Sequence, residues 1–202
     1  MNVTLIALLA LLLLGGTAHA NPGGPDPDHC TVLPPDEMAS PRLVGVPVNG
    51  SGGASIADLD ICIRSITGDP LSDIFVQVTF RASCNDPDPL CICTTGVFTG
   101  FTDLEGHLRL NLKFGGCCQD AYSAIIDAEG FPIRAYSIVV SPDYDGVRGN
   151  CAVTLADFVY FTTGYGQTGA PCRNLDGDAG DSCTLPDFVE FASAYASSCG
   201  GD

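Results

Sequence analysis

Carboxylates gather in two stretches near the end of the chain, and their spacing is that of oxygen ligands for a calcium ion. The first stretch reads D-Y-D-G-V-R-G-N-C-A-V-T-L-A-D-F from residue 143, and the second reads D-G-D-A-G-D-S-C-T-L-P-D-F from residue 176. A calcium ion takes about six to eight oxygens, which an acidic loop of about twelve residues supplies from alternating positions and a closing carboxylate. The candidate ligands are Asp143, Asp145, Asn150 and Asp157 in the first stretch and Asp176, Asp178, Asp181 and Asp187 in the second.

The second stretch matches this loop pattern better than the first. Counting back from Asp187 places oxygen-bearing residues at the first, third, seventh and ninth positions, and Asp181 or a water supplies the fifth ligand. Counting back from Asp157 places Gly146 and Arg148 at the first and third positions, so this loop binds calcium only if extra residues bulge outward. We predict a calcium site in the second loop and leave the first loop open. The alternative is that the two Asp-rich stretches are turns that merely cap helices.

A helix is expected directly after each acidic stretch. Both stretches continue as T-L-x-D-F-V-x-F-x-x-x-Y, and the two copies begin at Thr154 and Thr184. A match of this length in register indicates an internal duplication. Aromatic residues recur at i, i+3 and i+7, the spacing of one helix face, and they are Phe158, Phe161, Tyr165, Phe188, Phe191 and Tyr195.

Two acidic loops that each open a helix resemble the dockerin module, whose two calcium loops open helices that pack about a pseudo-twofold axis. The resemblance rests on the D-x-D…T-L-x-D-F pattern and covers residues 141–199. It implies a small all-α calcium-binding module over residues 142–202 that docks to a cohesin-like receptor. In dockerins the two residues before the closing aspartate commonly contact the cohesin, and here they are Leu155–Ala156 and Leu185–Pro186.

All 11 cysteines follow residue 20, and an exported chain with this many cysteines is expected to form disulfides. If the two helices pack antiparallel, the end of each lies beside the loop of the other. This geometry predicts the disulfides Cys172–Cys183 and Cys151–Cys199. Eleven is an odd number, and Cys30 is the expected unpaired thiol. The alternative to disulfides is a zinc site formed by Cys91 and Cys93 with Cys117 and Cys118.

The first 20 residues predict export. An apolar run is followed by Ala18-His19-Ala20, which is typical of a cleaved secretory signal peptide. No later segment is apolar and long enough to predict a membrane span. The mature protein is therefore expected to be secreted, either extracellular or at the cell surface. A net charge of −16 excludes nucleic acid as a partner and favours bound cations.

The middle of the chain predicts a β-sandwich. Residues 21–55 are rich in Pro and Gly and are expected to form an extended tail with a short strand around Leu43, either a plain linker or a strand that pairs with a neighbour's sheet edge. From residue 56 to 141, period-2 alternation predicts strands at 59–63, 75–81, 97–102, 107–114, 122–127 and 133–140, with residues 103–106 as a hairpin turn. This order resembles secreted bacterial immunoglobulin-like modules and implies an antiparallel scaffold or binding domain. The predicted fold is therefore mainly β, an immunoglobulin-like sandwich followed by a dockerin-like all-α module.

No catalytic arrangement is recognisable. His29 and His107 are the histidines after the signal peptide, and neither lies in a nucleophile–base motif. We predict a non-catalytic calcium-binding protein of extracellular assemblies, whose partner is either another copy of itself, in a filament or matrix, or a cohesin-like receptor. The alternative is an adhesin that binds carbohydrate or a surface, against which the absence of Trp counts.

Overall fold

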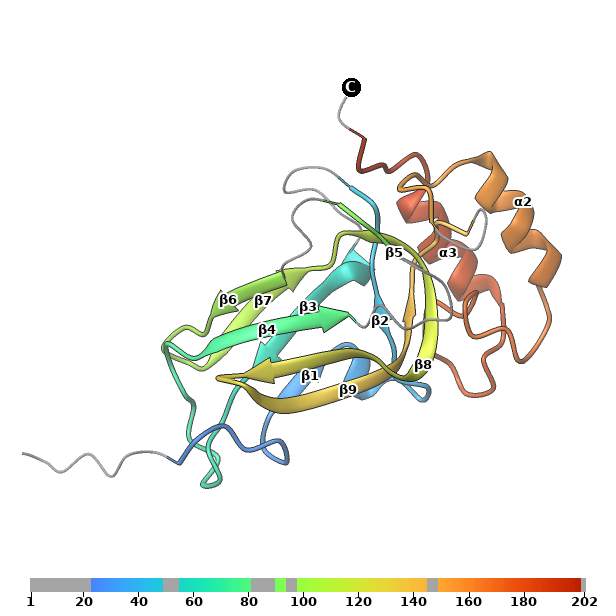
Figure 1. The fold of residues 1–202 in the computed structure, drawn as a ribbon. Coiled ribbons are helices and arrows are strands. Elements are labelled where there is room, and N and C mark those ends of the chain that lie inside the picture. Colours follow the sequence, from blue (N-terminus) through green and yellow to red (C-terminus); the bar gives the residue numbers. More distant parts are fainter. Residues whose placement is uncertain (1–22, 49–54, 81–89, 94–97, 145–148, 201–202) are drawn as a thin grey trace, which may run out of the picture.

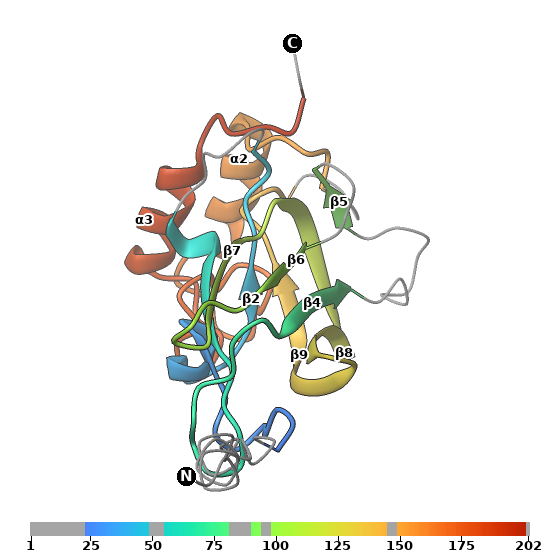
Figure 2. The same cartoon turned by 90° about the vertical axis from the view of Figure 1, so that its left-hand side faces the viewer.

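A computed structural model describes residues 23–48, 55–80, 90–93, 98–144 and 149–200. Two β-sheets pack face to face, and a pair of helices lies at one end of them (Figure 1 and Figure 2). The predicted signal peptide and Asp145 lie outside the described residues. The elements are β1 (Thr31–Leu33), η2 (Pro35–Glu37), β2 (Leu43–Val44), η3 (Ser55–Ala57), β3 (Asp58–Cys62), β4 (Phe75–Phe80), β5 (Leu90–Ile92), β6 (Phe98–Phe101), β7 (His107–Asn111), β8 (Phe114–Ala128), β9 (Phe131–Val140), α2 (Leu155–Gly164) and α3 (Leu185–Ala194).

The main apolar core lies between the two sheets. One sheet has the order β1-β3-β7, and the other has the order β2-β9-β8-β4-β6, with β5 added on β8. Alternation along β3 points Leu59 and Ile61 inward, where they share a buried cluster with Val76 of β4 and Ile126 of β8. The predicted mainly β fold with a sandwich body is therefore confirmed.

The predicted hairpin between residues 97–102 and 107–114 is wrong. Residues 103–106 do form a turn, closed by the Gly106 N–H donating to the carbonyl of Asp103 at 3.0 Å. However, β6 pairs with β4 and β7 pairs with β3, so the turn carries the chain from one sheet to the other. The two strands meet through side chains, because the Leu108 side chain lies over Gly100 and leaves no room there for a Cβ.

The segment before β3 is not the unpacked tail predicted from its composition. β1 pairs antiparallel with β3, and β2 pairs parallel with β9 of the same chain. Cys30, Leu43 and Val44 are buried. The short apolar strand therefore completes its own sheet, and the expectation of a strand for a neighbour's sheet edge is wrong.

The two helices begin where the repeated aromatic pattern predicts. Each follows a threonine at its N-terminus, and the third helical residue is an aspartate whose carboxylate accepts the backbone N–H of that threonine. In both helices this bond is 2.7 Å long, from Thr154 to Asp157 and from Thr184 to Asp187. Such a capping box satisfies amides that the first turn leaves without partners.

The end of each helix lies beside the loop that opens the other, as the antiparallel prediction requires. The Gly166 N–H donates to Cys183 at 2.7 Å, and the Ala196 N–H donates to Val153 at 2.9 Å. Phe161 and Phe191 stack at the centre, with ring centroids 5.2 Å apart.

The predicted disulfides Cys172–Cys183 and Cys151–Cys199 are nevertheless wrong. The disulfides among the described residues are Cys91–Cys151, Cys93–Cys199 and Cys117–Cys172. Cys199 does donate its N–H to the Cys151 carbonyl at 2.8 Å, but both side chains turn to the sandwich, where Cys91 and Cys93 project from one strand face. Cys183 is a buried free thiol, as are Cys30 and Cys62. The zinc alternative is therefore wrong as well.

The helices do not form a separate all-α module, contrary to the prediction. Their aromatic residues share a second buried cluster with side chains of the sandwich, among them Val44, Ile138 and Val140. The three disulfides join the same two parts covalently. A short helical pair has little apolar area of its own, so it completes its core against the sheet. In the described part of the chain, neither helix has the length and apolar character needed to cross a bilayer.

Candidate functional site

The closing aspartate of the second acidic loop is fully buried and surrounded by amide donors. The carboxylate of Asp187 accepts N–H groups of Leu175, of Asp176 at 3.1 Å and of Thr184 at 2.7 Å. Several amides on one carboxylate hold the loop closed around the start of α3.

The other carboxylates of this loop also have protein partners. Asp178 accepts the Asn174 amide at 2.9 Å and the Ser182 N–H at 3.0 Å. Asp181 accepts the Arg42 guanidinium at 2.7 Å and the Ser40 hydroxyl at 3.0 Å.

The first acidic loop is arranged in the same way. Asp157 is fully buried and accepts the N–H groups of Tyr144 and Thr154. Asp143, also fully buried, accepts the N–H groups of Asn150 at 3.1 Å and Cys151 at 2.8 Å. Asn150 itself accepts the Ala152 N–H at 3.0 Å.

In the structure, the described carboxylates of the two loops have protein groups as partners. Among the described residues, no group of three or more His, Cys, Asp or Glu side chains is placed to hold a metal ion. The carboxylates instead satisfy backbone amides and one arginine, which is the helix-capping alternative. The resemblance of residues 141–199 to a dockerin module is therefore wrong.

Arg42 is a structural residue that the sequence analysis missed. Its side chain is fully buried and donates to the carbonyls of Ser40, Pro171 and Asn174 as well as to Asp181. The nearby guanidinium lowers the pKa of the Asp181 carboxyl. One signal was available, since Arg42 is one of only eight basic residues against 24 acidic ones.

Two carboxyl groups near this loop, those of Asp176 and Glu190, have raised pKa values. Burial, with Asp187 and Asp178 nearby, raises the pKa of Asp176. Burial, with Asp176 and Asp187 nearby, likewise raises the pKa of Glu190. Acidic groups therefore lie close together beside α3, and the Arg42 guanidinium offsets part of their effect on Asp176.

The outward face of the helix pair is apolar. Leu155 is 63% exposed and Leu185 is 61% exposed, although both sit in the first turn of a helix. Other large apolar side chains are exposed on both helices or just after them, and they are Val159, Tyr160, Tyr165, Phe188, Val189 and Tyr195. These residues define the helix face. α2 and α3 contain no Lys or Arg, and the Arg173 guanidinium, from the segment between them, lies 4.3 Å from the centre of the Tyr160 ring.

A shallow groove runs between the two helices. It has a volume of about 310 Å³ and is lined by Leu155, Phe158, Phe188, Phe191, Ala192 and Tyr195. Its lining contains no charged residue. Contiguous exposed apolar surface rimmed by polar residues marks sites of interaction with other proteins.

No family model matches this chain. No curated protein matches it either. It is similar to chains in two crystal structures of type II cohesin–X–dockerin complexes from Acetivibrio cellulolyticus. The chain from an N-terminal interface mutant is 15% identical, with a TM-score of 0.27, over 77% of this chain and 96% of that chain. The chain from a C-terminal interface mutant is 11% identical, with a TM-score of 0.27, over 78% and 95%. At these scores neither similarity assigns a fold or a function.

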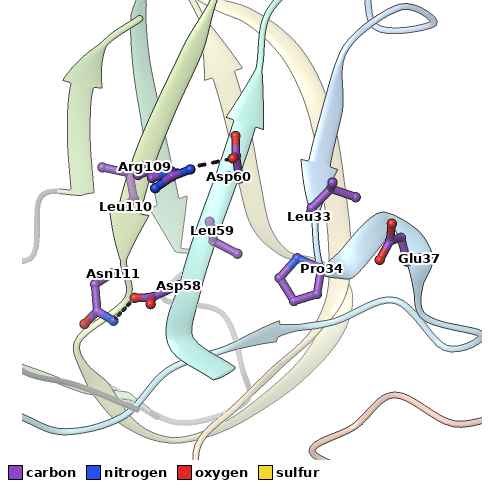
Figure 3. Close-up of a pocket in the computed structure, with 9 residues that line it drawn as sticks. All are labelled: Leu33, Pro34, Glu37, Asp58, Leu59, Asp60, Arg109, Leu110 and Asn111. Carbon is purple, nitrogen blue, oxygen red and sulfur yellow. Dashed lines mark hydrogen bonds and ion pairs between the residues drawn. The ribbon is translucent and has the colours of Figure 1, made fainter. Parts of the chain in front are cut away.

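A second, more polar groove lies on the sandwich body. It has a volume of about 630 Å³ and runs over the outer side of the three-stranded sheet (Figure 3). Its lining residues are Leu33, Pro34, Glu37, Asp58, Leu59, Asp60, Arg109, Leu110 and Asn111. His107 is partly exposed beside this groove, and its Nδ1 lies 2.7 Å from Oδ1 of Asp60.

Proposed function

We propose that this chain is a non-catalytic extracellular assembly protein that binds a partner protein on the helix face. The exposed apolar side chains repeated on α2 and α3, around an uncharged groove, carry the proposal. Tyr and Phe are enriched at the centre of protein interfaces, and Tyr is among the residue types that most often carry the binding energy there.

The partner is proposed to present an apolar ridge flanked by Lys and Arg. α2 and α3 themselves contain no Lys or Arg, and the Arg173 guanidinium lies over Tyr160 of α2. On α3, the pKa of Glu190 is raised by burial and by its acidic neighbours. A positive rim on the partner would relieve this repulsion and speed association. A second copy of the chain also has a net charge of −16, so it is a less favourable partner for the helix face.

An extracellular location agrees with the covalent structure. Three disulfides join segments far apart in the described chain, and such bonds persist in oxidising compartments. Export itself stays a prediction from residues 1–20, and calcium binding stays a prediction from the acidic loops.

The test places a photo-crosslinking residue at position 159, in place of Val159, to capture a partner from the culture supernatant. The captured protein is then purified, and its affinity for the chain is measured by titration. The double variant Leu155→Glu/Leu185→Glu places charge in the interface, and we expect affinity to fall by about 100-fold or more. Leu104→Glu is the matched control, because Leu104 is 81% exposed in the turn after β6. Affinity should also fall as salt is raised.

Two results would contradict the proposal. Equal affinity of the double variant and the control would place the interface elsewhere. Sedimentation that shows a dimer, lost in the double variant, would make a second copy the occupant.

A further inference from the structure

The outer side of the three-stranded sheet carries an ordered array of polar side chains. Strand pairing places Asp58 opposite Asn111, and it places Asp60 between Arg109 on one side and Leu33 on the other. Cross-strand partners project from the same side of a sheet. The array is therefore set by the register of β1, β3 and β7, and it lines the groove shown in Figure 3.

Part of this array is fixed in place by internal contacts. Asn111 donates its amide to Asp58, and His107 lies 2.7 Å from Asp60. Such contacts hold the carboxylates before any ligand arrives, which lowers the entropy cost of binding.

Several groups of the array, Asp58 among them, are exposed and can contact a ligand. The Arg109 side chain is 87% exposed, and its contact with Asp60 is long, at 3.6 Å. Asp58 and Glu37 are exposed carboxylates on opposite sides of β3. The groove thus offers guanidinium donors beside carboxylate acceptors, with Leu33 and Pro34 as apolar wall.

We propose that this groove binds a neutral oligosaccharide. A sugar hydroxyl both donates and accepts, so neighbouring hydroxyls can satisfy Asp58 and Arg109 together. The C–H face of a sugar ring packs on Leu33 and Pro34, because the lining of this groove contains no aromatic residue. The groove volume, about 630 Å³, lies within the usual range for small-ligand sites.

Charged ligands fit this groove less well. The carboxylates of Glu37, Asp58 and Asp60 repel phosphate and acidic sugars. The exposed guanidinium of Arg109, on β7 opposite Asp60 of β3, opposes a lysine or arginine side chain at the same place.

The proposal goes beyond the proposed function and is tested separately from it. Isotope-labelled full chain is titrated with neutral glucan, mannan, xylan and galactan hexasaccharides, with oligolysine and oligogalacturonate as charged probes. We expect one neutral series to shift the amide signals of β3 and β7. Asp58→Ala and Arg109→Ala should each weaken binding about tenfold. Asp28→Ala, an exposed aspartate outside the groove, and Leu155→Glu/Leu185→Glu on the helix face should bind as the unchanged chain does.

Three results overturn the proposal. The first is the absence of any shift at ~10 mM sugar, where even a weak site with millimolar affinity is filled. The second is binding that persists in both groove variants while their spectra show a folded chain. The third is binding of oligolysine alone, which assigns the groove to a cationic peptide instead.

Discussion

Arg42 and Asp181 lie 139 residues apart in the chain, and the guanidinium Nη2 lies 2.7 Å from the carboxylate Oδ1. The arginine is fully buried, so this ion pair ties the segment before β2 to the second acidic loop inside the molecule. Arg42 therefore brings positive charge to Asp181, a residue that the sequence pattern predicts as a calcium ligand.

Removing this arginine should strongly destabilise the fold. Arg42→Ala leaves Asp181 and the carbonyls of Pro171 and Asn174 without their donor, and we expect a loss of about 3–5 kcal/mol in the free energy of unfolding. Urea denaturation measures it. Arg42→Lys keeps the charge but not the forked geometry of the guanidinium, so its free energy of unfolding should lie between those of Arg42→Ala and the unchanged chain. An Arg42→Ala variant as stable as the unchanged chain would contradict the role given to this ion pair.

Because of the same ion pair, the free energy of unfolding should fall as the pH is lowered into the acid range. The Arg42 guanidinium lowers the pKa of Asp181 below its ordinary value of 3.8. A lowered carboxyl pKa contributes stability that is present above the ordinary value and is lost as pH falls through the folded-state value. Unfolding free energies measured between about pH 5 and pH 2 should therefore fall more steeply for the unchanged chain than for Asp181→Asn. Parallel curves would show that Asp181 is not the group responsible.

The buried capping aspartates should matter for stability independently of any metal ion. Asp157→Ala and Asp187→Ala each leave several amides without an acceptor, and we expect each to cost about 3 kcal/mol. Thermal unfolding in the presence of EDTA measures this, with Asp28→Ala as the exposed control. A loss that appears only when calcium is present would instead assign these carboxylates to an ion.

Calcium binding is tested by calorimetry on EDTA-stripped protein. The pKa of Asp176 is raised by burial and by Asp187 and Asp178, so a cation at the second loop would relieve repulsion there. We predict saturable binding that is lost in Asp176→Asn, a change that leaves the Asp187 cap in place. If the titration with calcium gives no heat while circular dichroism shows a folded chain, the acidic loops cap the helices and do not bind calcium.

Local structure was predictable from the sequence, whereas the partners of its elements were not. Period-2 alternation places β3, β4 and β9, and the repeated Phe pattern places α2 and α3. The turn at 103–106 was predicted, but a turn does not specify which sheet each flanking strand joins. The antiparallel helix ends were also predicted, yet the direction of each cysteine side chain depends on the sandwich packed against it.

Side chains that act across the fold were the least predictable. Arg42 follows a proline in a segment without periodicity, and nothing in its neighbourhood indicates burial. The groove residues illustrate the same limit, since alternation marks Asp58 and Arg109 as outward-facing but does not indicate that β3 and β7 pair. The acidic pattern alone does not separate two roles, because one spacing of aspartates serves both helix caps and metal loops.

The disulfides Cys91–Cys151, Cys93–Cys199 and Cys117–Cys172 have a mechanical consequence. They join the helix pair to the sandwich near the start of α2, after α3 and in the segment between the helices. A force that pulls on the helix face is therefore transmitted to the sheet through covalent bonds rather than through apolar contacts alone. Under tension, the helix pair remains attached to the body even after its shared core has opened, so the chain is built to stay connected under shear.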